Sequence, residues 1–236
     1  MSAARQTAIG LGLAALIVGG WVSLHVWAVF FHRLEGWGVA AAPVLIAVQS
    51  WLGAGMFIVA HDAMHGALAP GRPRVNAVVG QACVGAYAAF SFRKLNVCHH
   101  QHHRTPGVEG DPDFHAADPT RFGPWFLGFF LRYFGWREFA IVTAVLLAYL
   151  WLGARSANLI LFWAVPAILS ALQLFVFGTW IPHRHQREGV FPDHHNARTL
   201  PMPWILSLLT CFHFGRHHEH HLSPSTPWWR LPQVKV

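Results

Sequence analysis

The residues from Gln6 to His32 read QTAIGLGLAALIVGGWVSLHVWAVFFH and contain no formal charge in 27 positions. A helix that crosses a bilayer needs about 20 mostly apolar residues, so this stretch predicts a membrane anchor. It is longer than the apolar region of a signal peptide, which has about 7–15 residues. Of the 236 residues, 54% are hydrophobic and 11% are charged, whereas a soluble domain has about 25% charged residues. The composition therefore excludes a disordered chain and favours an integral membrane protein with one domain, residues 1–236.

Three further uncharged stretches have the character of spanning helices. Gly36 to His61 contains no formal charge over 26 positions, and Ser156 to His183 contains none over 28. A shorter run of 16 residues lies between Glu138 and Arg155, with aromatic residues near both ends, as is typical at a membrane interface. We therefore predict an all-α integral membrane fold with four transmembrane helices. Their expected bounds are 8–31, 39–60, 139–154 and 158–181.

The basic residues divide unequally between the two sides of this four-span topology. Of the 17 Lys and Arg residues, 15 fall on the side of the termini and the central loop, and only Arg33 and Arg155 fall opposite. Because Lys and Arg collect on the cytoplasmic side, we expect both termini and the central loop in the cytoplasm. Anionic lipid headgroups are a sufficient partner for the basic excess. No nucleic-acid-binding motif accompanies it, so we expect no nucleic acid as a partner.

The histidines are concentrated in a few short groups. His61 and His65 lie four residues apart at the end of the second predicted span, and His183 and His185 follow the last one. The motifs HHQHH at 99–103 and HHEHH at 217–221 each place histidines at positions i, i+3 and i+4, on one face of a helix. Neutral imidazole is a common metal ligand, and eight aligned imidazoles are too many for one ion. The pattern predicts two metal ions close together.

The surrounding residues limit the choice of metal. Glu219 is followed directly by two histidines, so the HExxH motif of zinc proteases is absent. The three cysteines, Cys83, Cys98 and Cys211, are too far apart in sequence to form a thiolate cluster. A site built from nitrogen alone suits iron, copper or zinc. Structural zinc closes with four ligands, whereas about four or five imidazoles per iron leave room for water or dioxygen. Two iron ions that activate O2 are the interpretation that uses every ligand.

Two other uncharged stretches, 75–92 and 203–215, are expected to lie along the membrane interface. If residues 75–92 crossed the bilayer, the pair His61 and His65 would be separated from the HHQHH motif by about 30 Å. The two groups could not then bind one pair of metals. We therefore predict that cytosolic and interfacial helices form a histidine-rich cap on one membrane face.

Longer strings around the histidines resemble those of a known family. They are HDAMHG at 61–66, HHQHH with a following Pro106-Gly107, DPDF at 111–114, FGTWIPHRH at 177–185 and CFHFGRHHEHHLSP at 211–224. Together they resemble the bacterial carotenoid ketolases of the membrane fatty acid desaturase and hydroxylase superfamily. The short histidine motifs indicate only the superfamily, and the last two strings are more specific. The resemblance extends from the first span to the C-terminus.

This resemblance implies a four-span helical fold with a cytosolic cap that holds two non-haem iron ions. The iron ligands that it implies are His61, His65, His99, His102, His103, His183, His217, His220 and His221. His185 is the alternative to His183 for the ninth position. Thr179 stands four residues before His183, where related desaturases carry an asparagine, and is a candidate for an outer-sphere role.

Carboxylates beside the motifs are candidates for orienting the ligands. Ligating histidines usually donate their other N–H to a carboxylate or a carbonyl. Asp62, which lies between two expected ligands, is the strongest candidate. Asp113, Asp111 and Glu219 are further candidates, whereas Glu188 is expected to be a solvated loop charge.

The resemblance further implies O2-dependent oxidation at C4 of the β-ionone ring of β-carotene. Two successive hydroxylations would give a gem-diol that loses water to a ketone, with echinenone and canthaxanthin as products. Each round needs two electrons, and the sequence has no flavin, haem or nicotinamide motif, so a ferredoxin-like donor or a reductase is implied. The carotenoid would enter sideways from the bilayer through an apolar channel. Channel candidates are Phe90, Phe92, Trp180 and Phe214, and the expected location is a bacterial inner membrane.

Other functions are compatible with part of the pattern. A carotenoid 3-hydroxylase or an acyl-lipid desaturase or hydroxylase would use the same histidines, although the FGTWIPHRH string favours the ketolases. A metal transporter would carry ligands near the middle of its spans, and here only His25 lies well inside one. A membrane metal sensor or store would bind iron without substrate-dependent consumption of O2.

Overall fold

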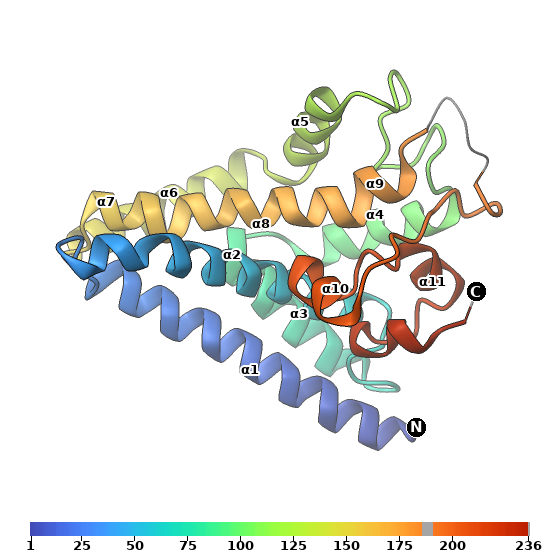
Figure 1. The fold of residues 1–236 in the computed structure, drawn as a ribbon, viewed down its shortest axis with the longest axis horizontal. Coiled ribbons are helices and arrows are strands. Elements are labelled where there is room, and N and C mark those ends of the chain that lie inside the picture. Colours follow the sequence, from blue (N-terminus) through green and yellow to red (C-terminus); the bar gives the residue numbers. More distant parts are fainter. Residues whose placement is uncertain (186–190, 236) are drawn as a thin grey trace.

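The computed structural model describes residues 1–185 and 191–235 of the chain (Figure 1). Within these ranges the regular structure consists of helices, and one isolated bridge joins Thr199 to Arg216. The all-α fold that the sequence predicts is thereby confirmed. Glu188 lies outside the described residues.

Three long apolar helices form the body of the molecule. The first two are α1 (Ala3–Phe30) and α2 (Trp37–Met64). The third is continuous from Ser156 to His183 and consists of α7 (Ser156–Leu159), η1 (Ile160–Ala164), α8 (Val165–Phe175), η2 (Val176–Trp180) and α9 (Ile181–His183). Each of the three has 28 residues and is therefore long enough to cross the hydrocarbon core. They cover the predicted spans 8–31, 39–60 and 158–181 to within five residues at each end.

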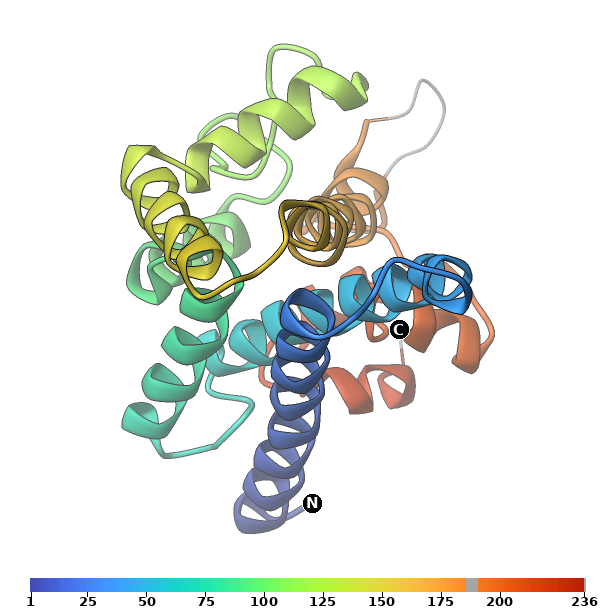
Figure 2. The same ribbon diagram turned by 90° about the vertical axis from the view of Figure 1, so that its left-hand side faces the viewer.

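The remaining predicted span, 139–154, corresponds to a shorter helix. This is α6 (Trp136–Trp151), which follows α5 (Phe122–Tyr133) after a bend of 77°. Figure 2, which looks along the bundle, shows α8 between α6 on one side and α1 and α2 on the other. The described residues contain three helices that are long and apolar enough to cross a membrane, or up to five if each bent pair is counted as a span. A total of four spans therefore stays a prediction.

The stretch 75–92 belongs to the other bent pair, in which the chain turns by more than a right angle. It forms α3 (Pro73–Ala88), and a bend of 103° leads into α4 (Phe92–Arg104). The bend is closely packed, because a Cβ added to Gly80 would lie 2.2 Å from the ring of Phe92. At the start of α3, Asn76 is hydrogen-bonded to the backbone of Ala69, just after α2. The end of α4 also lies beside the end of α2, since Nε2 of His99 is 2.7 Å from Nε2 of His65. The segment therefore enters and leaves at the same end of the bundle.

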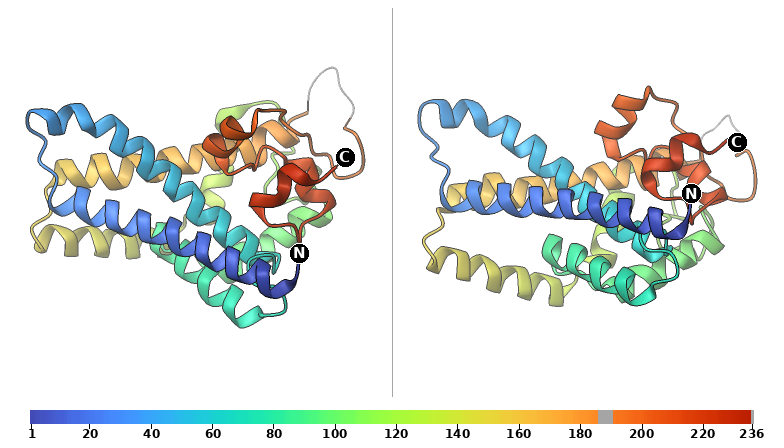
Figure 3. Two further views of the ribbon diagram at one scale, coloured as in Figure 1. Left: turned by 60° about the horizontal axis from the view of Figure 1, so that its bottom comes forward. Right: turned by 90° about the horizontal axis from the view of Figure 1, so that it is seen from below.

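The C-terminal residues fold back onto this end of the bundle. They form the short helices α10 (Trp204–Cys211), α11 (His217–Leu222) and η3 (Trp228–Gln233). Trp51 of α2 stacks on Phe212 with ring centroids 4.5 Å apart. Asp62 of α2 accepts a hydrogen bond of 3.1 Å from the backbone N–H of Trp228. Both termini lie at this end, and the connections after α1 and α6 lie at the other (Figures 1 and 3). The predicted interfacial segment 203–215 covers α10 and the turn after it.

Candidate metal centre and apolar cavity

The nine histidines proposed as ligands come from four segments that are far apart in the sequence. The segments are the end of α2, the helix α4, the end of α9 and the helix α11. The structure brings all nine together in two adjacent groups. The first group is His61, His65, His99, His103 and His220, and the second is His102, His183, His217 and His221. Within each group, the nearest ligand atoms lie within 4.8 Å of one another.

The motifs HHQHH and HHEHH each contribute histidines to both groups. In α4, the i and i+4 histidines belong to the five-histidine group, and the i+3 histidine, His102, belongs to the other. In α11 the assignment is reversed, because its i+3 histidine, His220, belongs to the five-histidine group. The two groups are close, since the rings of His103 and His221 stack with centroids 4.3 Å apart. In both α4 and α11, histidines on one helix face are thus divided between two neighbouring groups.

The ring nitrogens are arranged as metal ligands would be. Nε2 of His61 lies 3.1 Å from Nε2 of His220, so the nitrogens of the five-histidine group face one another. Nε2 of His183 is buried and has no hydrogen-bond partner among the described residues. A buried polar atom without a partner costs about 1–3 kcal/mol, and a metal ion would satisfy such a lone pair. The donor set therefore fits two metal ions with nitrogen ligands, whereas iron as the metal stays a prediction.

Hydrogen bonds to the opposite ring nitrogens orient two of these histidines. Nδ1 of His102 donates to the Asp111 carboxylate at 2.9 Å, and Nδ1 of His183 donates to the Asn196 carbonyl at 2.7 Å. In both rings, Nε2 is then left with a lone pair toward the group. His185 is directed elsewhere, because its Nε2 donates to the carbonyl of Gly107 at 3.1 Å. The geometry thus supports His183 as the ninth ligand.

Burial keeps three histidines of α11 in the form that binds metal. It lowers the pKa of His217, His220 and His221 well below the usual value for histidine. Their imidazoles are therefore neutral at pH 7, and neutral imidazole is the ligating form.

The carboxylates near the site have different partners. Asp111 makes the hydrogen bond to a candidate ligand that we expected of Asp62. Oδ1 of Asp62 is 3.8 Å from Nδ1 of His61, which is too long for a hydrogen bond. Asp113 accepts a hydrogen bond from the hydroxyl of Tyr133, and burial is the main cause that raises the pKa of Asp113 above its usual value. Glu219 forms an ion pair with Arg216 at 2.9 Å.

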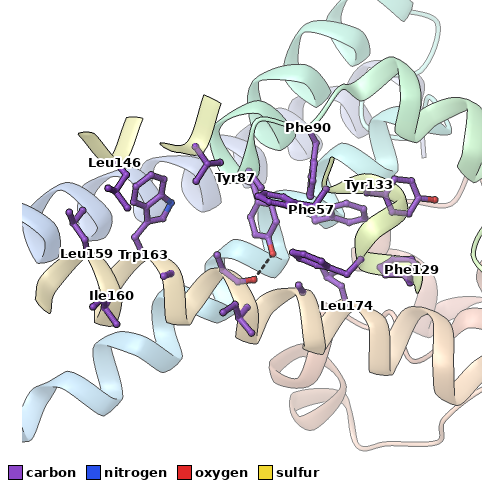
Figure 4. Close-up of a pocket in the computed structure, with 18 of the residues that line it drawn as sticks. Phe57, Tyr87, Phe90, Phe129, Tyr133, Leu146, Leu159, Ile160, Trp163 and Leu174 are labelled. Atoms are coloured by element: carbon purple, nitrogen blue, oxygen red, sulfur yellow. Dashed lines mark hydrogen bonds between the residues drawn. The ribbon is translucent and has the colours of Figure 1, made fainter. Parts of the chain in front are cut away.

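A small cavity borders the histidines, and a larger cavity lies beside it. The larger has a volume of about 420 Å³ and is lined by side chains of α2, α3, α4, α5, α6 and the part of the long helix from Ser156 to Leu174 (Figure 4). The smaller, of about 50 Å³, is bordered by histidines of both groups and by Asp113 and Thr179. Five residues line both cavities: Phe57, Leu95, Phe129, Tyr133 and Leu174. The large cavity therefore adjoins the small cavity, which borders both histidine groups.

The large cavity is long and almost entirely apolar. Its lining on the long helix runs from Ser156 to Leu174, a distance of about 27 Å at 1.5 Å per residue. Figure 4 shows Leu159 and Tyr133 at opposite ends of the cavity. The lining consists mainly of aliphatic and aromatic residues. Such a shape suits a rod-like hydrocarbon that reaches from the far side of the bundle to the metal groups.

Comparison with known proteins indicates the family of this chain. The sequence profile of the fatty acid desaturase family matches residues 35–141 and 130–236. A β-carotene ketolase of Paracoccus sp. (strain N81106 / MBIC 01143) is 46% identical over 99% of this chain and 95% of that protein. The chain belongs to the carotenoid ketolases of the fatty acid desaturase family. A second β-carotene ketolase, of Paracoccus sp. (strain PC1), is 46% identical over 98% of this chain and 93% of that protein. One of Haematococcus lacustris is 35% identical over 96% of this chain and 78% of that protein.

The residues predicted to line a substrate channel are only partly those that line the cavities. Of the four aromatic candidates, Phe90 lines the large cavity and Phe214 lines the small one. Phe92 packs into the bend between α3 and α4 instead, and the ring of Trp180 contacts Phe122. The residues that line both cavities were not identified from the sequence.

A repeating pattern in the long helix could have identified one wall. The residues Ile160, Ala164, Ala167, Ala171 and Leu174 line the cavity. They follow one another at intervals of four, three, four and three residues, so they share one helix face. Three alanines on that face leave room for a ligand, which is the signal that the sequence offered.

Proposed function

We propose that this chain is a di-iron oxygenase that introduces a keto group at C4 of the β-ionone ring of β-carotene. The adjacent five-histidine and four-histidine groups at the inner end of a long apolar cavity carry this proposal. The homology to β-carotene ketolases indicates an oxidoreductase. Two bound iron ions would supply the activation of O2 that no side chain can provide.

The protein's own residues would bind and position the substrate. The hydrocarbon chain would lie along the long helix between Ser156 and Leu174, where the cavity offers apolar contact over most of its length. One ring would then reach the junction of the two cavities, next to His61 and His102. Aromatic side chains such as Phe57 and Phe129 would surround that ring and exclude water. Asp111 and the Asn196 carbonyl would hold two ligating histidines in place.

The proposal includes a membrane topology and an external electron donor. We infer four spans, formed by α1, α2, α6 and the long helix, with both termini in the cytoplasm of a bacterial inner membrane. The long helices, the single end shared by all nine histidines and the distribution of basic residues support this topology. Each hydroxylation needs two electrons, which a ferredoxin-like protein or a reductase would deliver at the cap.

Pigment analysis of a β-carotene-producing bacterium that expresses this chain tests the proposal. We expect echinenone and canthaxanthin to accumulate, because both rings of the symmetric substrate can be oxidised in turn. A His217→Ala variant serves as the control and should leave β-carotene unchanged, since His217 belongs to the four-histidine group. Chromatography that finds only 3-hydroxylated pigments would falsify the ketolase assignment. Iron binding without any oxidised pigment would indicate a metal store instead.

A further inference from the structure

The junction between the two cavities contains one polar side chain. Of the five residues that line both cavities, four are apolar and the fifth is Tyr133. Tyr133 belongs to α5, and only 7% of it is exposed. Figure 4 shows its hydroxyl directed away from the far end of the large cavity. The hydroxyl donates to Asp113, which lines the small cavity with four of the histidines, so it lies on the histidine side of the junction.

The hydroxyl of Tyr133 belongs to a small polar network, in which it donates to Oδ1 of Asp113. Asp113 is fixed through its backbone, because its N–H donates to Asp111 at 2.8 Å and its carbonyl accepts from Trp125 Nε1 at 2.7 Å. Asp113 lines the small cavity together with His61, a histidine of the five-histidine group. The network thus places a carboxylate and a phenol oxygen, both hydrogen-bond acceptors, beside the histidine groups.

A ketolase must handle an intermediate that differs from its substrate in polarity. In the first round, the C4–H bond, O2, two electrons and two protons give the C4 alcohol and one water. In the second round, the alcohol, O2, two electrons and two protons give the gem-diol and one water. The gem-diol then loses water to leave the ketone. A ferredoxin-like carrier supplies the electrons in both rounds.

The alcohol would be poorly held by an apolar junction alone. A buried hydroxyl without a hydrogen-bond partner is destabilised relative to one in water. The alcohol would then leave before its remaining C4–H bond is oxidised. A fixed hydrogen-bond acceptor at the junction retains the alcohol for the second round.

We propose that Asp113 and Tyr133 form a binding site for the C4 alcohol, and that this site favours a second oxidation over release. The proposal rests on the proposed function. The alcohol donates its hydrogen to the Asp113 carboxylate or to the oxygen of Tyr133, whose own hydrogen is engaged by Asp113. β-Carotene has no hydroxyl and makes no use of the pair. The pair therefore acts on the second round and has little effect on the first.

The test compares Tyr133→Phe with Tyr87→Phe. Both variants lose a phenol oxygen from the lining of the large cavity, but the hydroxyl of Tyr87 is bonded to Ser170 at 2.8 Å and to the Ala167 carbonyl at 2.9 Å. In the pigment-producing strain, Tyr133→Phe should raise the ratio of 4-hydroxy to 4-keto products about tenfold, the effect expected for one hydrogen bond to a charged network. Tyr87→Phe should leave that ratio unchanged. Asp113→Asn should change the ratio in the same direction as Tyr133→Phe.

A binding measurement separates this role from a general effect on catalysis. Quenching of tryptophan fluorescence in the iron-loaded protein in nanodiscs, without an electron donor, reports the affinity for β-carotene and for its synthetic 4-hydroxy derivative. Tyr133→Phe should weaken binding of the alcohol about tenfold and leave binding of β-carotene unchanged. An unchanged product ratio with unchanged alcohol binding would overturn the proposal, as would equal weakening of both ligands. If the wild-type protein forms no oxidised carotenoid at all, the proposed function fails instead.

Discussion

At the scale of single residues, His183 and His185 provide a direct test of the metal centre. Nε2 of His183 is buried without a partner among the described residues and faces the four-histidine group, whereas Nε2 of His185 donates to a backbone carbonyl. We expect His183→Ala to lower the iron content from about two ions per chain to one or fewer and to abolish turnover, because a four-ligand site would keep only three imidazoles. Metal analysis of the purified protein measures this directly.

His185→Ala serves as the matched control, since it removes an imidazole two residues away. It should keep both metal ions, because its ring contacts Phe114 and Phe191 and its Nε2 donates to the carbonyl of Gly107. Full iron in His183→Ala together with loss of iron in His185→Ala would exchange the roles of these two histidines.

The residue scale also shows where the sequence is sufficient for predicting the site. Spacing alone places His99, His102 and His103 on one face of a helix, and the structure brings them to the metal groups. It does not reveal that His102 belongs to a different group from its neighbours. That division depends on how α4 and α11 are rotated against each other, which long-range packing determines. Long-range packing also explains why Asp62 does not orient a histidine as expected. Its carboxylate accepts a hydrogen bond from the backbone of Trp228, 166 positions away.

At the scale of the helix, the alanine-lined face of the long helix is expected to set the length of the substrate. Ala164 lies in the far part of the cavity, about 15 Å from Leu174 at 1.5 Å per residue. Ala164→Phe should reduce oxidation of full-length β-carotene about tenfold, because a large side chain in a fitted cavity costs about 1–3 kcal/mol. A ring compound with a truncated polyene should keep its rate, since it does not reach this position. Rates for the two substrates in membranes measure the effect.

Leu169→Phe is the control for this change. Leu169 lies on the same helix, is 41% exposed, and does not line the cavity. It should leave both rates unchanged. Equal loss of both substrates in Ala164→Phe would mean that the helix has been distorted and that the cavity does not hold the polyene.

Helices differed in how well the sequence predicted them. The long spans follow from uncharged runs, because a helix of about 20 apolar residues without a charge is typical of a bilayer crossing. The bends between α3 and α4 and between α5 and α6 were less predictable. Gly80 permits the first bend by admitting the ring of Phe92, and nothing in the local pattern pairs these two residues. The apolar cavity is bordered by both bends, so its lining was predicted only at Phe90.

At the scale of the whole molecule, all nine histidines lie at one end, together with both termini. This arrangement requires an even number of crossings, so α6 must cross if α1, α2 and the long helix do and the pair α3–α4 does not. The cysteine variants Glu35→Cys and Leu152→Cys lie in the connections after α1 and α6 at the other end. In intact cells, both should react with a membrane-impermeant maleimide. The 15 to 2 distribution of basic residues predicts the orientation of the protein in the membrane, because the end with more Lys and Arg faces the cytoplasm.

Glu109→Cys is the control at the opposite end, since Glu109 is an exposed residue between α4 and α5. It should react only after the cells are permeabilised. The native cysteines interfere little, because Cys83 and Cys211 are buried and Cys98 is partly so. Labelling of Leu152→Cys only after permeabilisation would mean that α6 does not cross. The long helix would then run in the opposite direction and would carry His183 away from the other eight histidines, which is incompatible with a single metal centre.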